Sequence, residues 1–416
     1  MADPGKENTA LGISADRGWM VTFAGTGINL ALGVLYTWSV ISKQITKAWG
    51  WNETQAALPY SVAIAVFAFM MVPAGRLQDK MGPRLVATLG GIFCGVGLII
   101  ASLGQSVVGM VIGFGILAGT GIGFGYASAT PPAVKWFPPE KTGLIAGLVV
   151  AGFGLASVYI APVANYLLTR FGIERTFLIV GIAFLVVLLL LSQLLKNPPA
   201  GYRPGSNQSG SKGKGAAKPP AVPVDYEIGE MLRTPQFYLL WIMFCFGAGA
   251  GLMIIGKLAK IVDLQAGIRA GFIFVAMLAI GNAAGRITAG VLSDRIGRTW
   301  TMFGVFIFQA VLMFLLRGLD TYGTLFLASV LIGFNYGANL SVFPSATKDY
   351  FGLKNFGVNY GFVFTAWGAG GILGPLLSGY IYDTYKNFQT AYLIAAICLL
   401  IAAGLTFVTR PPQAKA

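Results

Sequence analysis

The stretch GRLQDKMG at residues 75–82 returns as GVLSDRIG at residues 290–297, and this repetition decides the fold. A second similarity lies at nearly the same separation: KWF at 135–137 is matched by DYF at 349–351, and each is followed by two glycines at the same spacing. Two independent similarities at nearly one separation indicate that the chain is a duplicated unit, each copy filling about half of its length.

The composition places the chain in a membrane. Hydrophobic residues make up 56% of its 416 residues and charged residues only 11%, whereas soluble proteins carry about 25% charged residues. Apolar runs long enough to cross a hydrocarbon core of ~30 Å as a helix recur throughout. They are centred near residues 30, 66, 94, 118, 155, 184, 249, 279, 309, 335, 367 and 398. With the repeat, they predict an all-α membrane protein whose 12 transmembrane helices form two pseudo-symmetric six-helix halves.

The boundaries follow from these runs. We expect a cytoplasmic N-terminal segment at 1–17, a first six-helix bundle at 18–196, a cytoplasmic linker at 197–233, a second bundle at 234–410 and a cytoplasmic tail at 411–416. Within the linker, GSNQSGSKGKG (205–215) has the composition of a flexible connection. DYEIGEML (225–232) predicts a short amphipathic helix on the cytoplasmic surface.

The basic charge indicates orientation. The net charge is +14, and segments that would be cytoplasmic hold about twice as many Lys and Arg residues as the outer segments, as the positive-inside rule requires. We therefore expect both termini in the cytoplasm and the protein in a bacterial inner membrane. Membrane lipid is then a partner and nucleic acid is not, and nothing in the sequence demands more than a monomer.

The sequence lacks the residue patterns expected of an enzyme or a metal site. The chain has no histidine, which removes the commonest general base and metal ligand. The 15 carboxylates fall in termini, loops and span ends, and the three cysteines sit singly in apolar runs. We expect no catalytic residue, no metal and no cofactor.

Arg286 is the one charged residue well inside an apolar run. A cation at membrane depth costs roughly 3 kcal/mol on insertion scales, so such residues usually face a partner or a wet cavity. Asp294 is roughly 12 Å away along a helix, too far to pair. Arg286 is therefore a candidate anion-binding residue, and the alternative is a guanidinium that reaches the cytoplasm or touches backbone carbonyls.

The repeated stretch also has a mechanical interpretation. Asp79 and Arg84 in the first copy, and Asp294 and Arg298 in the second, lie at cytoplasmic helix ends. Charge networks there can latch a helix to its neighbours and break when the halves rock. The alternative is a solvated loop.

The repeat resembles that of the major facilitator superfamily, and the resemblance covers essentially the whole chain. A finer resemblance is to the monocarboxylate transporters and the related oxalate/formate antiporters. The motifs that carry it are DRGW (16–19), WFP (136–138), AGFG (151–154), FPS (343–345) and NYG (359–361).

This resemblance implies that Arg286 binds a substrate carboxylate in the eighth helix. The family has a proton-coupling aspartate one turn earlier, where this chain has Asn282, and a lysine in the first helix where it has Ser39 or Val40. Asn282 can bond a substrate but cannot take up a proton. Asp263 is the remaining proton-coupling candidate, and the alternative is an interfacial charge beside Lys257 and Lys260.

The antiporter branch pairs its arginine with a lysine of the eleventh helix, at the position of Trp367 here. One cation matches one carboxylate, so the resemblance implies a monocarboxylate. Aromatic residues at cavity positions of that branch complete the expected substrate site, although each is also compatible with packing or lipid contact. They are Tyr36, Tyr126, Tyr336 and Phe364, with Asn29, Asn335 and Asn339 as weaker polar candidates.

We therefore expect an alternating-access transporter that moves lactate-like or pyruvate-like monocarboxylates with a proton. An obligate carboxylate exchanger of the oxalate/formate type is the first alternative. A transport-inactive membrane receptor or scaffold is the second.

Overall fold

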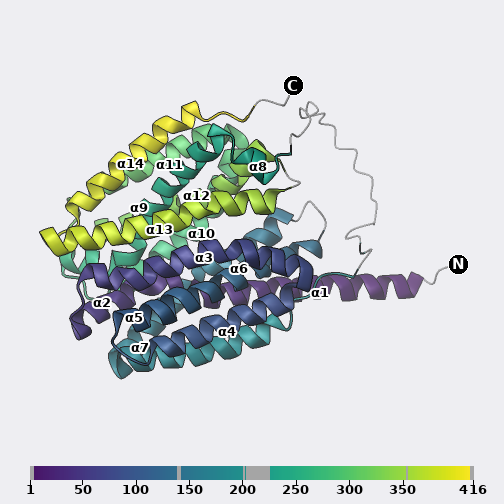
Figure 1. Ribbon diagram of the computed structural model, residues 1–416, viewed down its shortest axis with the longest axis horizontal. Helices are drawn as coiled ribbons and strands as arrows, with labels where there is room; N and C mark the ends of the chain where they lie inside the picture. The colour runs from purple at the N-terminus through teal and green to yellow at the C-terminus, as the bar shows by residue number, and fades with distance from the viewer. Residues whose placement is uncertain (1–3, 138–141, 200–201, 203–224, 353–354, 413–416) are drawn as a thin grey trace.

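Long helices run side by side through the computed structural model, with the first half (purple to teal) lying against the second (green to yellow) in Figure 1. The structure describes residues 4–137, 142–199, 202, 225–352 and 355–412. Within these ranges every regular element is helical, as the apolar runs predicted.

The described part of the first half contains nine helical segments, some of them only a turn or two long. They are α1 (Pro4–Leu32), η1 (Gly33–Thr37), α2 (Trp38–Trp49), α3 (Glu53–Met81), α4 (Pro83–Ala101), α5 (Val107–Met110), η2 (Val111–Ala118) and α6 (Gly119–Lys135), followed by the long α7 (Thr142–Ser192). The segments α1, η1 and α2 together make one membrane crossing, and α5, η2 and α6 make another.

The second half begins with a single turn of helix and continues with six long helices. They are α8 (Ile228–Met231), α9 (Pro235–Ala266), α10 (Gly271–Ile296), α11 (Arg298–Leu316), α12 (Tyr322–Phe351), α13 (Phe356–Tyr385) and α14 (Gln389–Val408).

Eleven stretches of the described chain are long and apolar enough to cross a membrane, and one of them accounts for two crossings. The stretch Leu144–Ser192 has 49 residues, about 74 Å of helix against a core of ~30 Å. Gly172 breaks it with φ 79°, a conformation that a side chain would disfavour. The prediction of twelve crossings is thus confirmed.

Two helices differ in extent from the expectation. Helix α1 already begins at Pro4, inside the segment expected to precede the bundle, and Figure 1 shows it projecting beyond the other helices. The amphipathic helix expected at 225–232 is only α8, a single turn started by a capping box between Glu227 and Glu230. The flexible stretch 205–215 lies outside the described residues, as do most of the linker and tail.

The halves meet most extensively along two helix pairs, α3 with α13 and α7 with α10, and also where α2 packs against α9. Gly371 of α13 packs so closely on Ile64 of α3 that a Cβ would overlap the isoleucine side chain, and a Cβ at Gly379 would overlap the backbone of Glu53. We call the end of the bundle where α1 begins and α14 ends the terminal end. The opposite end, where α2 and α9 end, is the far end.

Candidate substrate site around Arg286

Arg286 lies in α10, with its guanidinium directed to the first half. Its Nε donates to Oδ1 of Asn282, one turn earlier, at 3.0 Å, and its Nη1 donates to the backbone oxygen of Val150 in α7 at 3.4 Å. None of the ion pairs found among the described residues includes Arg286. Two carbonyl-type oxygens solvate the cation, and no described carboxylate neutralises it.

Asn282 adds an unused donor beside this cation. The residue is 0% exposed, and its Nδ2 has no hydrogen-bond partner in the described structure. A buried amide N–H without an acceptor costs about 1–3 kcal/mol. A carboxylate bound at Arg286 would supply that acceptor.

Glycines place this pair against the neighbouring helix. A Cβ at Gly285 of α10 would overlap the backbone oxygen of Phe334 in α12, and a Cβ at Gly337 would overlap that of Asn282. Small residues let two helix backbones approach this closely in a membrane. The approach holds Arg286 and Tyr336 on one side of the α10–α12 pair.

The expected aromatic residues gather around the arginine. Tyr36, Tyr126 and Tyr336 all lie within electrostatic reach of its guanidinium. The hydroxyls of Tyr36 and Tyr336 are 2.8 Å apart and join the two halves. Tyr126 packs edge-on against Phe153, as Tyr36 does, with ring centroids 5.3 and 5.1 Å apart.

The two other expected residues stand one step further from the cation. The indole Nε1 of Trp367 donates to the hydroxyl of Tyr336 at 2.7 Å. Phe364 stacks on Trp367 with centroids 5.1 Å apart. The structure thus brings all seven sequence-predicted site residues into one cluster, with Arg286 and Asn282 at its polar end.

A cavity of about 500 Å³ leads to this cluster from the terminal end. Its walls come from α3, α6 and α7 of the first half and from α12 and α13 of the second. Tyr126 and Val150, which flank Arg286, line it, and Arg76 is the one charged residue in its described wall. A solute can therefore approach Arg286 between the halves without meeting a carboxylate in that wall.

The comparisons with known proteins agree with this geometry. The sequence profile of the Major Facilitator Superfamily matches residues 19–281 and 261–416. The chain belongs to the major facilitator superfamily. Its members' fold is also the one found by structural comparison: a bacterial homologue of the human lysosomal transporter Spinster superposes with a TM-score of 0.69, at 18% identity, over 94% of this chain and 97% of that one.

Relatives within the superfamily include carboxylate carriers. The chain is 30% identical to the uncharacterized transporter YhjX of Escherichia coli (strain K12), over 85% of this chain and 86% of that one. It is 29% identical to the oxalate:formate antiporter of Oxalobacter formigenes (95% and 92%) and 24% identical to monocarboxylate transporter 13 of Rattus norvegicus (95% and 89%). The resemblance inferred from the motifs is confirmed.

The sequence analysis did not predict three residues of this transporter's site. Val150 contributes only a backbone oxygen, which no side-chain pattern reveals. Gly154 lies beside the arginine, since a Cβ there would be in ordinary van der Waals contact with Nε of Arg286, at 3.7 Å. Tyr360 lines the cavity. Gly154 and Tyr360 fall within the AGFG and NYG motifs, so those motifs held the signal.

The weaker polar candidates mostly serve packing. Nδ2 of Asn29 donates to the backbone oxygen of Val149 at 2.8 Å, and Nδ2 of Asn339 donates to that of Asn335 at 3.0 Å. Nδ2 of Asn335 has no partner in the described structure.

Asp263 lies at the far end, away from Arg286. Its Oδ2 pairs with Nζ of Lys43 across the halves at 3.1 Å, and both side chains are partly exposed. Lys257 and Lys260, expected as its neighbours, instead pair with Glu53 at 2.6 and 2.9 Å. The carboxylate of Asp383 accepts hydrogen bonds from the backbone nitrogens of Glu53 and Thr54, both at 2.9 Å. We call Glu53, Lys257, Lys260 and Asp383 the far-end cluster.

The expected latch residues Arg84 and Arg298 each contact residues of their own half only, as far as the structure describes them. Arg298 pairs with Asp294 at 2.7 Å and with Asp349 of α12 at 2.8 Å, so it ties α10, α11 and α12 together. In the first half, Nη2 of Arg84 donates to the backbone oxygen of Gln193 at 2.8 Å. The side chain of Asp79 lies outside the described part of the structure. A gating role for these residues stays a prediction.

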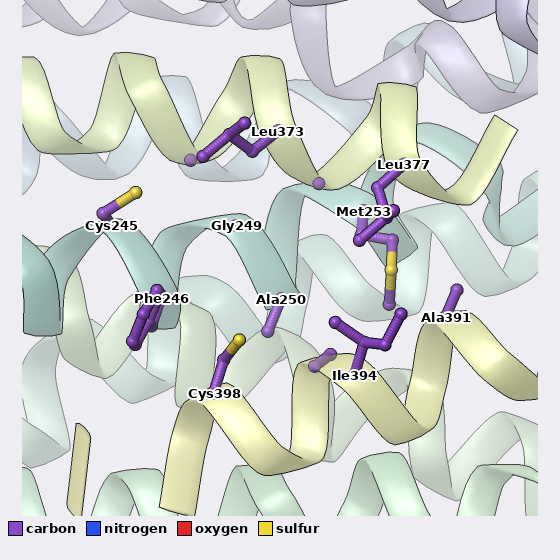
Figure 2. A pocket seen from close by; sticks show the side chains of 13 residues that line it. Cys245, Phe246, Gly249, Ala250, Met253, Leu373, Leu377, Ala391, Ile394 and Cys398 are labelled. Carbon is purple, nitrogen blue, oxygen red and sulfur yellow. The ribbon is translucent and has the colours of Figure 1, made fainter. Parts of the chain in front are cut away.

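A second cavity, between α9, α13 and α14, has no charged residue in its wall (Figure 2). Its labelled side chains are apolar apart from the thiols of Cys245 and Cys398. An anion has no partner there, so this cavity does not compete with the Arg286 site.

Proposed function

We propose that this transporter carries small monocarboxylates, of the lactate or pyruvate kind, by alternating access and together with a proton. The observation that carries the proposal is that the Arg286 guanidinium lies next to an unused hydrogen-bond donor, Nδ2 of Asn282. Arg286 has no carboxylate partner among the described residues, and the unused Nδ2 of Asn282 lies beside it. A carboxylate matches both groups, because it accepts from the guanidinium and from the amide.

The charge at this site limits the substrate. Trp367 is neutral and donates to Tyr336, at the position where the antiporter branch has a lysine. Arg286 is therefore the one cation among the seven site residues. One guanidinium neutralises one carboxylate, and a second carboxylate buried there would need a further cation. The relatives named for monocarboxylates support the same substrate class.

The positive-inside distribution of Lys and Arg supports a cytoplasmic location of the terminal end. With that orientation, the cavity opens to the cytoplasm and the far-end cluster closes the outer side. The conformation is then inward-facing, and transport requires the far end to open.

Proton symport is tested with purified protein in liposomes. We expect labelled L-lactate to accumulate when the outside is more acidic than the inside, and uptake to fall to the level of empty liposomes with Arg286→Ala. Uptake by wild-type protein that ignores the proton gradient would rule out symport.

One observation favours obligate exchange as the second candidate. Asn282 cannot hold a proton, and no described carboxylate lies at Arg286. Exchange would require a carboxylate trapped inside the liposomes and would be insensitive to the proton gradient. The same preparation therefore separates the two candidates.

A further inference from the structure

Three buried polar side chains from three different helical segments form a hydrogen-bonded chain beside Arg286. The indole N–H of Trp367 in α13 donates to the hydroxyl oxygen of Tyr336 in α12 at 2.7 Å. That hydroxyl lies 2.8 Å from the hydroxyl of Tyr36 in η1. The exposed fractions of the three side chains are 1, 1 and 3%, so bulk water hardly reaches them.

The chemistry of the indole fixes the direction of the first bond of this chain. An indole nitrogen only donates, so the Tyr336 oxygen is an acceptor. The Tyr336 proton then has one partner among the described hydrogen bonds, the oxygen of Tyr36. Either hydroxyl can donate in that contact. When an acceptor lies beside Tyr36, donation runs from Trp367 to Tyr336 to Tyr36, and the proton of Tyr36 is donated onward.

The free end of the chain faces the arginine. Tyr36 packs edge-on against Phe153, and a Cβ on the next residue, Gly154, would lie 3.7 Å from Nε of Arg286. The guanidinium offers no acceptor, and Oδ1 of Asn282 already accepts from its Nε. An oxygen of a bound anion beside the guanidinium would accept the proton of Tyr36 in place of the Tyr336 oxygen, and this would give the chain its direction.

We propose that Trp367 is a positioning residue that turns the hydroxyl of Tyr36 toward the substrate carboxylate through Tyr336. The proposal rests on the proposed function, because the acceptor is the carboxylate held by Arg286. The hydroxyl of Tyr36 is then an additional hydrogen-bond donor to the substrate that carries no charge. The site keeps one cation, Arg286, for one carboxylate. The chain crosses from the second half to the first, so it is complete only while the far end is closed.

A double-mutant cycle tests the chain. Trp367→Phe keeps an aromatic ring stacked on Phe364 and removes the N–H donor, and Tyr36→Phe removes the last hydroxyl. The Kd for L-lactate is measured by calorimetry on purified protein. We expect each single variant to bind about 5-fold more weakly. Because Trp367 acts through Tyr36, we expect the double variant to bind no more weakly than Tyr36→Phe alone.

Trp241→Phe is the matched control. Its indole nitrogen donates to Oγ1 of Thr365 at 2.9 Å, a comparable bond between α9 and α13, and we expect its Kd to be unchanged. Losses that multiply in the double variant, or wild-type affinity in Trp367→Phe, would overturn the chain. Thermal unfolding of each variant identifies a misfolded protein, and Tyr336→Phe, which cuts the chain at its middle, then replaces Trp367→Phe in the cycle.

Arg286→Ala in the same assay separates this proposal from the proposed function. Wild-type affinity in Arg286→Ala would overturn the carboxylate site itself. Loss of binding in Arg286→Ala together with multiplying losses in the cycle would overturn the chain alone.

Discussion

Glu53 of the first half and Lys257 of the second form an ion pair of 2.6 Å, and the two residues are only 3% and 1% exposed. Lys260 adds a second contact to the same carboxylate at 2.9 Å. Removing one partner of a buried pair leaves an uncompensated charge, at a cost of about 3–5 kcal/mol. Since the pair spans the interface that must open at the far end, it stabilises the conformation with that end closed.

Glu53→Gln should therefore shift the protein toward a conformation open at the far end. Electron–electron distances between spin labels at positions 47 and 386, on opposite halves beside the cluster, report that opening. We expect a longer-distance population to appear in the variant. Lys43→Gln is the control, because it removes a partly exposed ion pair at the same end, worth about 0–1 kcal/mol. Equal shifts in the two variants would contradict a special role for Glu53.

The close approach of α10 and α12 should not tolerate a methyl group. A Cβ at Gly337 would overlap the backbone oxygen of Asn282, so Gly337→Ala must push the two helices apart. We expect a lower unfolding temperature and loss of L-lactate binding. Gly304→Ala, where a Cβ meets nothing within 4 Å, should leave both quantities unchanged. A stable Gly337→Ala that still binds L-lactate would show that this approach does not position the site.

Asp263 is the carboxylate that the sequence nominates for proton coupling. If it carries the proton, Asp263→Asn should lose accumulation driven by a proton gradient and keep exchange of lactate between the two sides, because exchange needs no net proton movement. Counterflow in proteoliposomes measures the second activity. Gradient-driven accumulation that survives in Asp263→Asn would exclude this residue as the coupling site.

Arg298 should matter for stability more than for the closure of the far end. Its two carboxylate partners, Asp294 and Asp349, belong to its own half and are exposed. We expect Arg298→Ala to lose about 1 kcal/mol of stability and to keep wild-type distances between spin labels at positions 47 and 386. A shift in those distances would instead support the gating role that the repeated motif suggested.

The sequence predicted the helices and the site because each has a local signal. Apolar runs set the crossings, and a lone arginine in one of them marks a polar position whatever the packing. The two crossings that the sequence separates appear as one continuous helical stretch, because the chain bends at Gly172 alone. The short α8 was overestimated because DYEIGEML has helical periodicity while its capping box spans one turn.

The far-end cluster could not be predicted in the same way. Glu53 and Lys257 are about half the chain apart in sequence, and each alone looks like an ordinary charge at a span end. Only the packing of α3 against α9 and α13 shows that the carboxylate is buried between two lysines. The hydrogen bond of Trp367 to Tyr336 was equally hidden, because an aromatic residue in a membrane helix does not reveal its neighbours.

The most direct test of the account is binding of carboxylic acids of two to four carbons to wild-type protein and to Arg286→Ala. Calorimetry on folded, monodisperse samples gives both affinities, with lactamide as an uncharged analogue of lactate. We expect wild-type protein to bind a monocarboxylate and not lactamide. In Arg286→Ala we expect affinity to fall at least about 100-fold, since two charge-assisted hydrogen bonds are lost. A variant that binds the same acid as tightly as wild type would contradict the account.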